Sequence, residues 1–137
     1  MLDTNICSYI ISNRPPEVRE HFSSLKSGQA AMSVVTWGEM ILGVEKNTQI
    51  KLAIKLETSS KTAVRVIPME PDSAKFYGVI RAFLETQGTL ISTNDIWIAA
   101  HAMSCGHILV TNNEKEFSRV PGLRRENWVL TPSDSNS

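Results

Sequence analysis

The fold is indicated most clearly by one stretch of the chain, residues 92–117, which reads STNDIWIAAHAMSCGHILVTNNEKEF. Residues 94–104 are apolar almost all round a helical wheel, which predicts a buried helix. The HILV segment at 107–110 predicts a short buried strand, and the polar residues 111–116 after it predict a turn and a helix start. A buried helix that leads into a buried strand favours a parallel sheet with helices on its faces.

The same alternation extends along the rest of the chain. Further strands are predicted at Met1–Leu2, Ala30–Val35, Ala63–Pro68 and Trp128–Leu130. Further helices are predicted at Thr4–Ser12, Glu17–Leu25, Thr36–Lys46, Thr48–Thr58 and Asp72–Gln87. The expected fold is therefore α/β, a three-layer α/β/α sandwich with a central, mainly parallel sheet of about four to five short strands.

The helix predicted at residues 72–87 has the clearest end signals. Asp72 or Ser73 should cap its start, and Gly88 should end it because glycine tolerates a left-handed backbone. The side chains predicted to face inward are Phe76, Tyr77, Ile80, Phe83 and Leu84. This spacing is typical of an amphipathic helix that covers one face of a sheet.

The size and charge of the chain limit the classes of protein to which it can belong. A chain of 137 residues with 42% hydrophobic residues can form one domain with a buried core, expected over residues 1–130 and followed by a polar, disordered tail at 131–137. Net charge is zero, with 14 basic and 14 acidic residues. A wholly electrostatic nucleic-acid binder would be more basic.

No targeting or membrane segment is predicted. Acidic Asp3 and polar Asn5 interrupt the start, and no basic region precedes them, so a signal peptide is not expected. The longest apolar stretches are too short to cross a bilayer. Cys7 and Cys105 lie in apolar, helix-like settings and are predicted to be small buried residues without a disulfide. We expect a cytoplasmic protein without membrane contact.

Three carboxylates stand where an extended apolar segment gives way to a helix. They are Asp3 in MLDTN, Glu39 in SVVTWGEM and Asp95 in STNDIW. In parallel sheets, ligands bind outside the carboxyl ends of the strands, so the fold could gather these acids in one pocket. Clustered carboxylates repel one another unless a cation lies between them, and oxygen ligands favour Mg²⁺ or Mn²⁺. The pattern predicts a metal-dependent hydrolase.

Each of these acids also has a purely structural interpretation. Asp3 could cap a helix, Glu39 could form a capping box with Thr36, and Asp95 could interact with a helix dipole. Asp95 is the hardest to interpret in this way, because its helix has almost no polar face. Burying an unpaired anion costs several kcal/mol, whereas the dipole of an exposed helix end contributes only about 0.3–1 kcal/mol. Asp95 therefore requires a cationic partner.

Other polar residues could complete or support such a site. Glu116 or Asn113 follows a predicted strand and could complete it, although a solvated turn is an equal alternative. Thr4 and Asn5 could orient the Asp3 carboxylate, although ordinary capping is the alternative. His101 and His107 have no Cys or His partners at zinc spacing and are predicted to be structural, as packed or capping residues.

Several motifs in order resemble the PIN-domain ribonucleases, specifically the VapC-type toxins of type II toxin–antitoxin pairs. They are MLDTNI at 1–6, SVVTWGEMILGVEK at 33–46, NDIWIAAHA at 94–102 and VTNNEKEF at 110–117, and the similarity continues to RVPGLRRENWV at 119–129. A single motif of this kind would be weak evidence. Four in the family's order and spacing make the resemblance specific, and it covers nearly the whole chain.

The resemblance implies an active site and a reaction. It implies that Asp3, Glu39 and Asp95 bind Mg²⁺ or Mn²⁺ and that Glu116 is a further catalytic acid, with Thr4, Asn5 and Asn113 in supporting positions. Many members have Asp after the fourth strand, where this chain has Asn113 followed by Glu116. A metal-bound hydroxide would hydrolyse an RNA phosphodiester and leave a 5′-phosphate and a 3′-hydroxyl.

The resemblance also implies partners. These are an RNA substrate such as tRNA, whose cleavage would inhibit translation, a VapB-type antitoxin and a second copy of the chain in a homodimer. Two alternatives remain open. One is a non-catalytic PIN-like module that binds RNA or protein. The other is an acid- and Mg²⁺-dependent phosphatase or phosphotransfer protein, which would need a second acid beside Asp3 and a lysine at a strand end.

Overall fold

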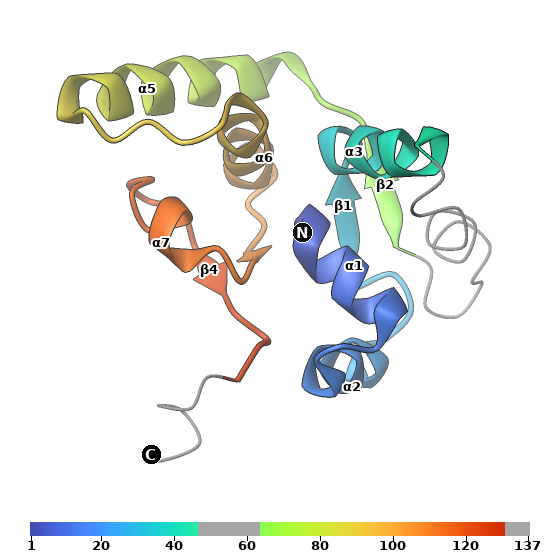
Figure 1. Ribbon diagram of the computed structural model, residues 1–137. Coiled ribbons are helices and arrows are strands. Elements are labelled where there is room, and N and C mark those ends of the chain that lie inside the picture. Colours follow the sequence, from blue (N-terminus) through green and yellow to red (C-terminus); the bar gives the residue numbers. More distant parts are fainter. Residues whose placement is uncertain (47–63, 131–137) are drawn as a thin grey trace.

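The computed structural model describes residues 1–46 and 64–130, and its strands form one parallel sheet (Figure 1). β1 (Ala31–Ser33) pairs with β2 (Arg65–Ile67), and β3 (Leu109–Val110) pairs with β4 (Arg125–Glu126). Leu2 joins the two pairs, because it bridges to Met32 on one side and to Val110 on the other. The order is therefore β2, β1, Leu2, β3, β4. The predicted parallel sheet of short strands is confirmed.

Alternating strand residues divide between two hydrophobic cores, one on each face of the sheet. Leu2 and Val110 pack with residues of α1 (Thr4–Ser12) and α2 (Pro16–Ser24). The adjacent Met1 and Leu109 belong to the other core, which contains residues of α5 (Pro71–Gln87), α6 (Thr93–Ser104) and α7 (Glu114–Phe117). Since successive side chains of a strand point to opposite faces, helices cover both faces of the sheet. The three-layer α/β/α arrangement is confirmed.

Helix α3 (Val34–Glu45) leads out of β1 and contacts both α1 and α6. It begins two residues earlier than predicted, because the Ser33 side chain accepts a hydrogen bond from the Val35 backbone N–H at 3.1 Å. Thr36 therefore lies inside the helix, and the capping box that it could have formed with Glu39 is absent. The Ser33 cap determines how α3 leaves the sheet.

Two other boundaries differ from the sequence prediction. Helix α5 begins at Pro71, a residue favoured in the first helical turn, and neither Asp72 nor Ser73 caps it. It ends as predicted at Gly88, whose φ is +66°. The last strand is β4 rather than 128–130. Trp128 is instead buried beside it and donates its indole N–H to Glu126 Oε1 at 2.8 Å.

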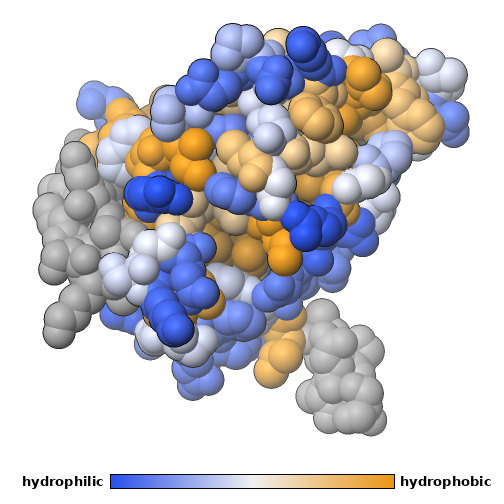
Figure 2. All heavy atoms as spheres, turned by 180° about the vertical axis from the view of Figure 1, so that it is seen from behind, coloured by the Kyte–Doolittle hydropathy of each residue, from blue (hydrophilic) through white to orange (hydrophobic). Residues whose placement is uncertain are grey.

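The outer face of α5 is more apolar than expected. Ile80 and Leu84 are buried as predicted, but Phe83 is 41% exposed and Val79 is 72% exposed. Hydrophobic side chains accordingly reach the surface along α5 (Figure 2). A cavity of about 440 Å³ lies there, lined by Phe76, Val79, Ile80, Phe83, Met103, Pro121 and Lys75. The inward placement predicted for Phe83 is wrong, because α5 buries only a narrow stripe.

The two cysteines behave differently. Both are free thiols; Cys7 is buried as predicted, whereas Cys105 is exposed, because it forms the C-cap where α6 ends. None of the helices within 1–46 and 64–130 has both the length and the apolar character needed to span a bilayer. The predicted helix at 48–58 and the predicted tail at 131–137 lie outside the described residues.

Candidate active site

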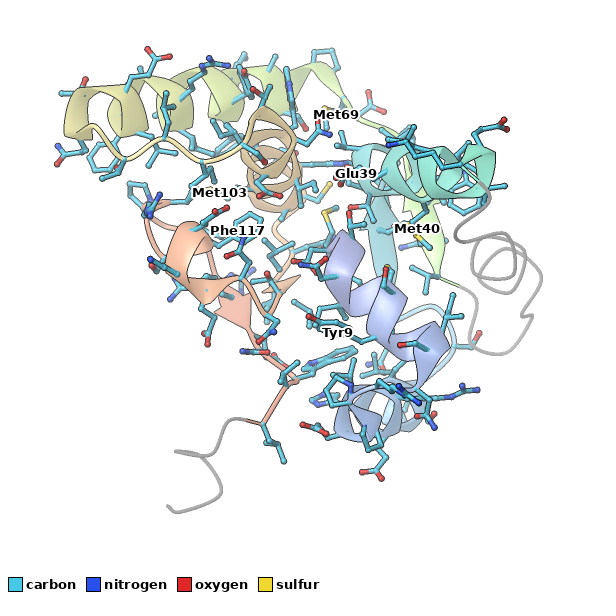
Figure 3. All side chains as sticks on the ribbon, in the orientation of Figure 1. Tyr9, Glu39, Met40, Met69, Met103 and Phe117 are labelled. Carbon is cyan, nitrogen blue, oxygen red and sulfur yellow. The ribbon has the colours of Figure 1, made fainter. Side chains whose placement is uncertain are left out.

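Four carboxylates lie together at the carboxyl edge of the sheet, and we call them the acid cluster: Asp3, Glu39, Asp95 and Glu116. Asp3 directly follows Leu2, and its backbone N–H donates to the Val110 carbonyl at 3.0 Å. Glu39 lies on α3, Asp95 in the first turn of α6, and Glu116 on α7 after β3 (Figure 3 labels Glu39). Each acid therefore comes from a different segment. The negative charges of other members raise the pKa values of both Asp3 and Asp95.

Asp3 is the most buried member of the acid cluster, with only 5% of its surface exposed. Burial raises its pKa to about 6, although hydrogen bonds from the Thr111 side chain and the Ile6 N–H oppose this effect. The charges of Asp95 and Glu39 raise the pKa further. Asp3 Oδ1 accepts the Ile6 N–H at 2.9 Å and so caps α1. Asp3 is thus a helix cap and a member of the acid cluster at the same time.

Asp95 lies half-buried beside Glu116. Burial is the main cause that raises the pKa of Asp95, and the Glu116 carboxyl adds to it both as a like charge and as a hydrogen-bond partner. The side chain of Ser92 lowers this pKa, and Ser92 Oγ also caps α6 by accepting the Asp95 N–H at 3.2 Å. Two carboxyl groups in contact are most stable when they share a proton or when a cation replaces it.

Neutral donors orient the other two acids. Thr4, which was expected beside Asp3, donates its hydroxyl to Glu39 Oε1 at 2.6 Å. Asn113 donates its side-chain amide to Glu116 Oε2 at 2.9 Å. Asn5 is exposed, and its side chain makes no hydrogen bond within the described ranges. Of the three expected supporting residues, Thr4 and Asn113 contact the acid cluster.

Two residues that contact the acid cluster were missed by the sequence analysis. Thr111 is fully buried; it hydrogen-bonds to Asp3 and its Oγ1 accepts the Asn113 N–H at 2.9 Å. Ser92 caps the helix that carries Asp95. The sequence contains a signal for each of these two residues. Thr111 is the first residue after the HILV strand, and Ser92 precedes Asp95 by three positions, the spacing of a capping box.

Among the described residues, no cationic side chain forms an ion pair with the acid cluster. In the same residues, no three His, Cys, Asp or Glu side chains are arranged so that they could hold a metal ion as they stand. The donors are all carboxylate oxygens, the chemistry that a hard divalent ion prefers. Binding an ion there would require side chains such as Glu39 and Glu116 to turn from their present partners.

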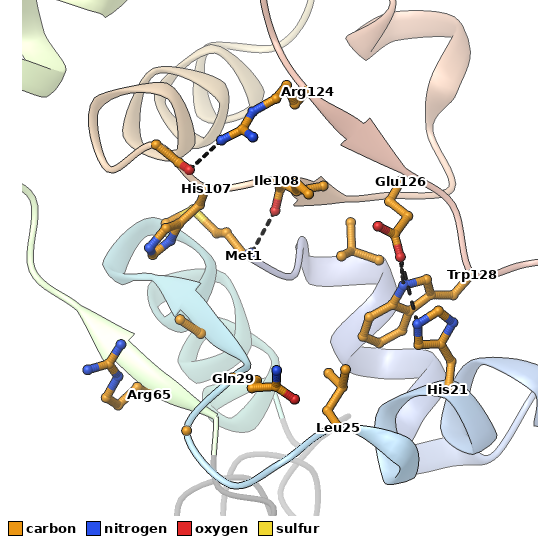
Figure 4. A pocket seen from close by; sticks show the side chains of 14 residues that line it. Met1, His21, Leu25, Gln29, Arg65, His107, Ile108, Arg124, Glu126 and Trp128 are labelled. Carbon is orange, nitrogen blue, oxygen red and sulfur yellow. Dashed lines mark hydrogen bonds and ion pairs between the residues drawn. The ribbon is translucent and has the colours of Figure 1, made fainter.

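A second cavity lies at the opposite, amino edge of the sheet (Figure 4). This amino-edge cavity of about 430 Å³ is lined by residues that include Met1, Arg65, His107, Arg124, Glu126 and Trp128. Arg124 donates to the Gly106 carbonyl at 2.6 Å, and His21 approaches Glu126 at 3.7 Å. None of the four acids lines this cavity. The acid cluster and the amino-edge cavity are therefore separate sites.

Comparisons with known proteins agree with this fold. The sequence matches the PIN domain over residues 1–123, and the chain belongs to the PIN-domain family. It is 43% identical to Ribonuclease VapC2 of Haemophilus influenzae over 94% of this chain and 97% of the relative. It is 42% identical to a tRNA(fMet)-specific endonuclease VapC of Shigella flexneri over 93% of this chain and 96% of that one. The resemblance to VapC-type ribonucleases is confirmed.

A solved structure shows the same architecture. The DNA-bound VapBC from Salmonella typhimurium superposes with a TM-score of 0.82 and 36% sequence identity. The match covers 94% of this chain and 97% of that one. The fold prediction therefore holds along nearly the full length of the chain.

Proposed function

We propose that this chain is a divalent-metal-dependent endoribonuclease of the VapC type, with residues 1–130 as a single nuclease domain. The observation that supports it most is the acid cluster: four carboxylates converge from four segments, and no ion pair offsets their charge within the described residues. Such a cluster is stable when ionised only if a cation is supplied from outside. Mg²⁺ or Mn²⁺ suits its oxygen donors.

Each acid has a role in this proposal. Asp3, Glu39 and Asp95 hold the ion, which when bound supplies a Lewis acid and a water of lowered pKa for attack on an RNA phosphodiester. Thr4 orients Glu39 by its hydrogen bond. Glu116, in contact with Asp95 and held by Asn113, moves protons at its carboxylate during the reaction. The products are a 5′-phosphate and a 3′-hydroxyl.

The relatives support a substrate and partners. The name of the Shigella flexneri relative specifies tRNA(fMet), and the Salmonella typhimurium structure is a DNA-bound VapBC complex. We therefore propose a structured RNA such as tRNA as the substrate, and inhibition of translation in the cytoplasm as the consequence. We also propose a VapB-type antitoxin as the partner that neutralises the enzyme, and a homodimer as the working form.

A cleavage assay on a pool of small RNAs tests the proposal. We expect discrete fragments with 5′-phosphates in Mg²⁺, and no fragments in EDTA or with Asp3→Asn or Asp95→Asn. Cleavage that survives EDTA and both substitutions would come from a contaminant and would overturn the mechanism. A folded protein that binds RNA but never cuts it would instead support a non-catalytic PIN-like module.

A further inference from the structure

Apart from the acid cluster, a buried polar contact links α6, which carries Asp95, to Ser33, the residue that caps α3, which carries Glu39. His101 of α6 and Ser33 at the end of β1 are both completely buried. His101 Nδ1 lies 2.7 Å from Ser33 Oγ, although the two residues are 68 positions apart in the chain. Buried polar groups are costly unless they are paired, so this contact has a structural consequence.

The hydrogen-bonding roles in this contact follow from the helix cap. Ser33 Oγ accepts the Val35 N–H at 3.1 Å, so its own proton is available to His101 Nδ1. With Ser33 as the donor, the neutral ring carries its proton on Nε2; in the other tautomer, Nδ1–H donates to the second lone pair of Ser33 Oγ, and the contact is kept in both. Burial lowers the pKa of His101, which keeps the ring neutral. The Pro68 carbonyl raises this pKa and so opposes the effect of burial. Within the described residues, Nε2 has no partner at normal hydrogen-bond distance.

Neither partner can act directly on a substrate. A nucleophilic serine must be reachable by the atom that it attacks, whereas Ser33 and His101 are enclosed by protein. What the contact does is join the two helices that carry Glu39 and Asp95. Ser33 stands six residues before Glu39 and His101 six residues after Asp95, about 9 Å along each helix.

A second contact holds α6 to its other neighbour. Ser104 Oγ donates to the His101 carbonyl at 2.9 Å and lies 2.9 Å from Ser73 Oγ of α5. Helix α6 is thus tied to α5 through Ser104 and to the start of α3 through His101. With α6 held on two sides, the His101–Ser33 contact is a direct polar link between α6 and the start of α3.

We propose that His101 is a positioning residue that sets the separation of Glu39 and Asp95, and so the affinity of the acid cluster for its divalent ion. This inference rests on the proposed function of the acid cluster. A metal site loses affinity when outer partners no longer hold its ligands, typically by about 10–100-fold. His101 would act at a greater distance, so we expect an effect near the lower end of that range.

Two substitutions of His101 separate the hydrogen bond from the bulk of the side chain. In His101→Asn the amide oxygen takes the place of Nδ1 and can still accept from Ser33. In His101→Gln the amide reaches only the place of Nε2 and leaves Ser33 without its acceptor. Direct Mn²⁺ binding, measured by electron paramagnetic resonance on the full chain, reports the site without relying on catalysis.

We expect His101→Gln and Ser33→Ala to weaken Mn²⁺ binding about tenfold and His101→Asn by less than about threefold. At saturating metal, cleavage by all three should approach that of the unaltered chain. Ser33→Ala also removes the cap of α3, so the double variant His101→Gln, Ser33→Ala should be no weaker than Ser33→Ala alone, because the contact that His101→Gln removes is already absent there. Equal binding by the Asn and Gln variants, after correction for the folded fraction, would overturn the proposal.

The same measurements keep the two proposals apart. If the unaltered chain neither binds Mn²⁺ nor cuts RNA, the proposed function fails. If it does both and the His101 variants do not differ in affinity, only the positioning role fails. A loss of activity at saturating metal that follows the loss of folded protein would show that His101 is merely structural.

Discussion

The two edges of the parallel sheet differ in charge. The carboxyl edge carries the acid cluster, whose hydrogen-bond donors are hydroxyl, amide and backbone groups. The amino edge carries Arg65, Arg124 and His107, and Glu126 is the only acid among the described residues that line its cavity. The net charge of zero therefore hides a separation of charge along the strand direction.

The difference shows why the acids can lie together at one edge. Helices α1, α3 and α6 begin at the carboxyl edge, where Asp3, Ser33 and Ser92 cap them. Helix N-termini carry partial positive charge and favour nearby anions. That help is smaller than the cost of burying Asp3, since its pKa remains raised. The acid cluster thus favours an added cation, whereas the amino edge already carries the cationic side chains of Arg65 and Arg124.

The largest expected effect comes from removing a charge from the carboxyl edge. Asp3→Asn keeps a residue that can cap α1 but loses a proposed metal ligand. We expect cleavage to fall on the order of a thousandfold. Initial rates at saturating Mg²⁺, with the melting temperature as a control for folding, measure the effect. A change below tenfold would mean that Asp3 is only a helix cap.

The stability of the metal-free protein should depend on the ionisation of Asp3. Its pKa of about 6 lies above the ordinary 3.8, so the fold favours the protonated form. That stabilisation is complete below about pH 4 and is lost as the pH rises through about 6, a change of up to about 3 kcal/mol. Urea unfolding in EDTA at about pH 4 and about pH 8 should show it in the difference between the unaltered chain and Asp3→Asn.

Added Mg²⁺ provides the control for this pH effect. It should remove most of the loss at high pH in the unaltered chain and have little effect in Asp3→Asn. If the difference between the two chains does not change with pH, Asp3 does not titrate as its burial implies.

A smaller effect is expected from a neutral donor at the same edge. Thr4→Val keeps the shape of the side chain but removes the hydroxyl that donates to Glu39. We expect the Mg²⁺ concentration for half-maximal cleavage to rise about tenfold. Thr4→Ser is the matched control, because it retains the hydroxyl, and it should stay close to the unaltered chain. Equal values for Val and Ser would remove Thr4 from the site.

The smallest effect is expected at the amino edge. Arg65 is exposed and lines the amino-edge cavity, away from the acid cluster. Arg65→Gln should change kcat and KM for RNA cleavage by no more than about twofold. Steady-state kinetics at two salt concentrations would measure it. A tenfold rise in KM at the lower salt concentration that shrinks at the higher one would mean that RNA reaches this edge and that the two edges act together.

Much of the fold was predictable because local signals were strong. Helix α1 has the predicted bounds, and Gly88 ends α5 as expected. The grouping of Asp3 and Asp95 was predictable because each lies at the start of a helix, whereas Glu39 lies five residues inside α3 and reaches the same edge through the packing of that helix. Errors arose where packing between elements decides the outcome. Phe83 has an apolar side chain at a helical spacing, yet it is 41% exposed and lines a cavity together with Met103 and Pro121.

The succession of strands and helices along the chain and the family could be recognised from the sequence, because hydrophobic period and motif spacing are local properties. It also indicated the acids Asp3, Glu39 and Asp95, which the structure brings to the carboxyl edge of the sheet. Two contacts could be seen only once the chain was folded: Thr4 donates to Glu39 rather than to Asp3, and Ser33 contacts His101. Such pairs join residues 35 and 68 positions apart. They depend on how helices are set against one another, and that follows from the packing of the whole core.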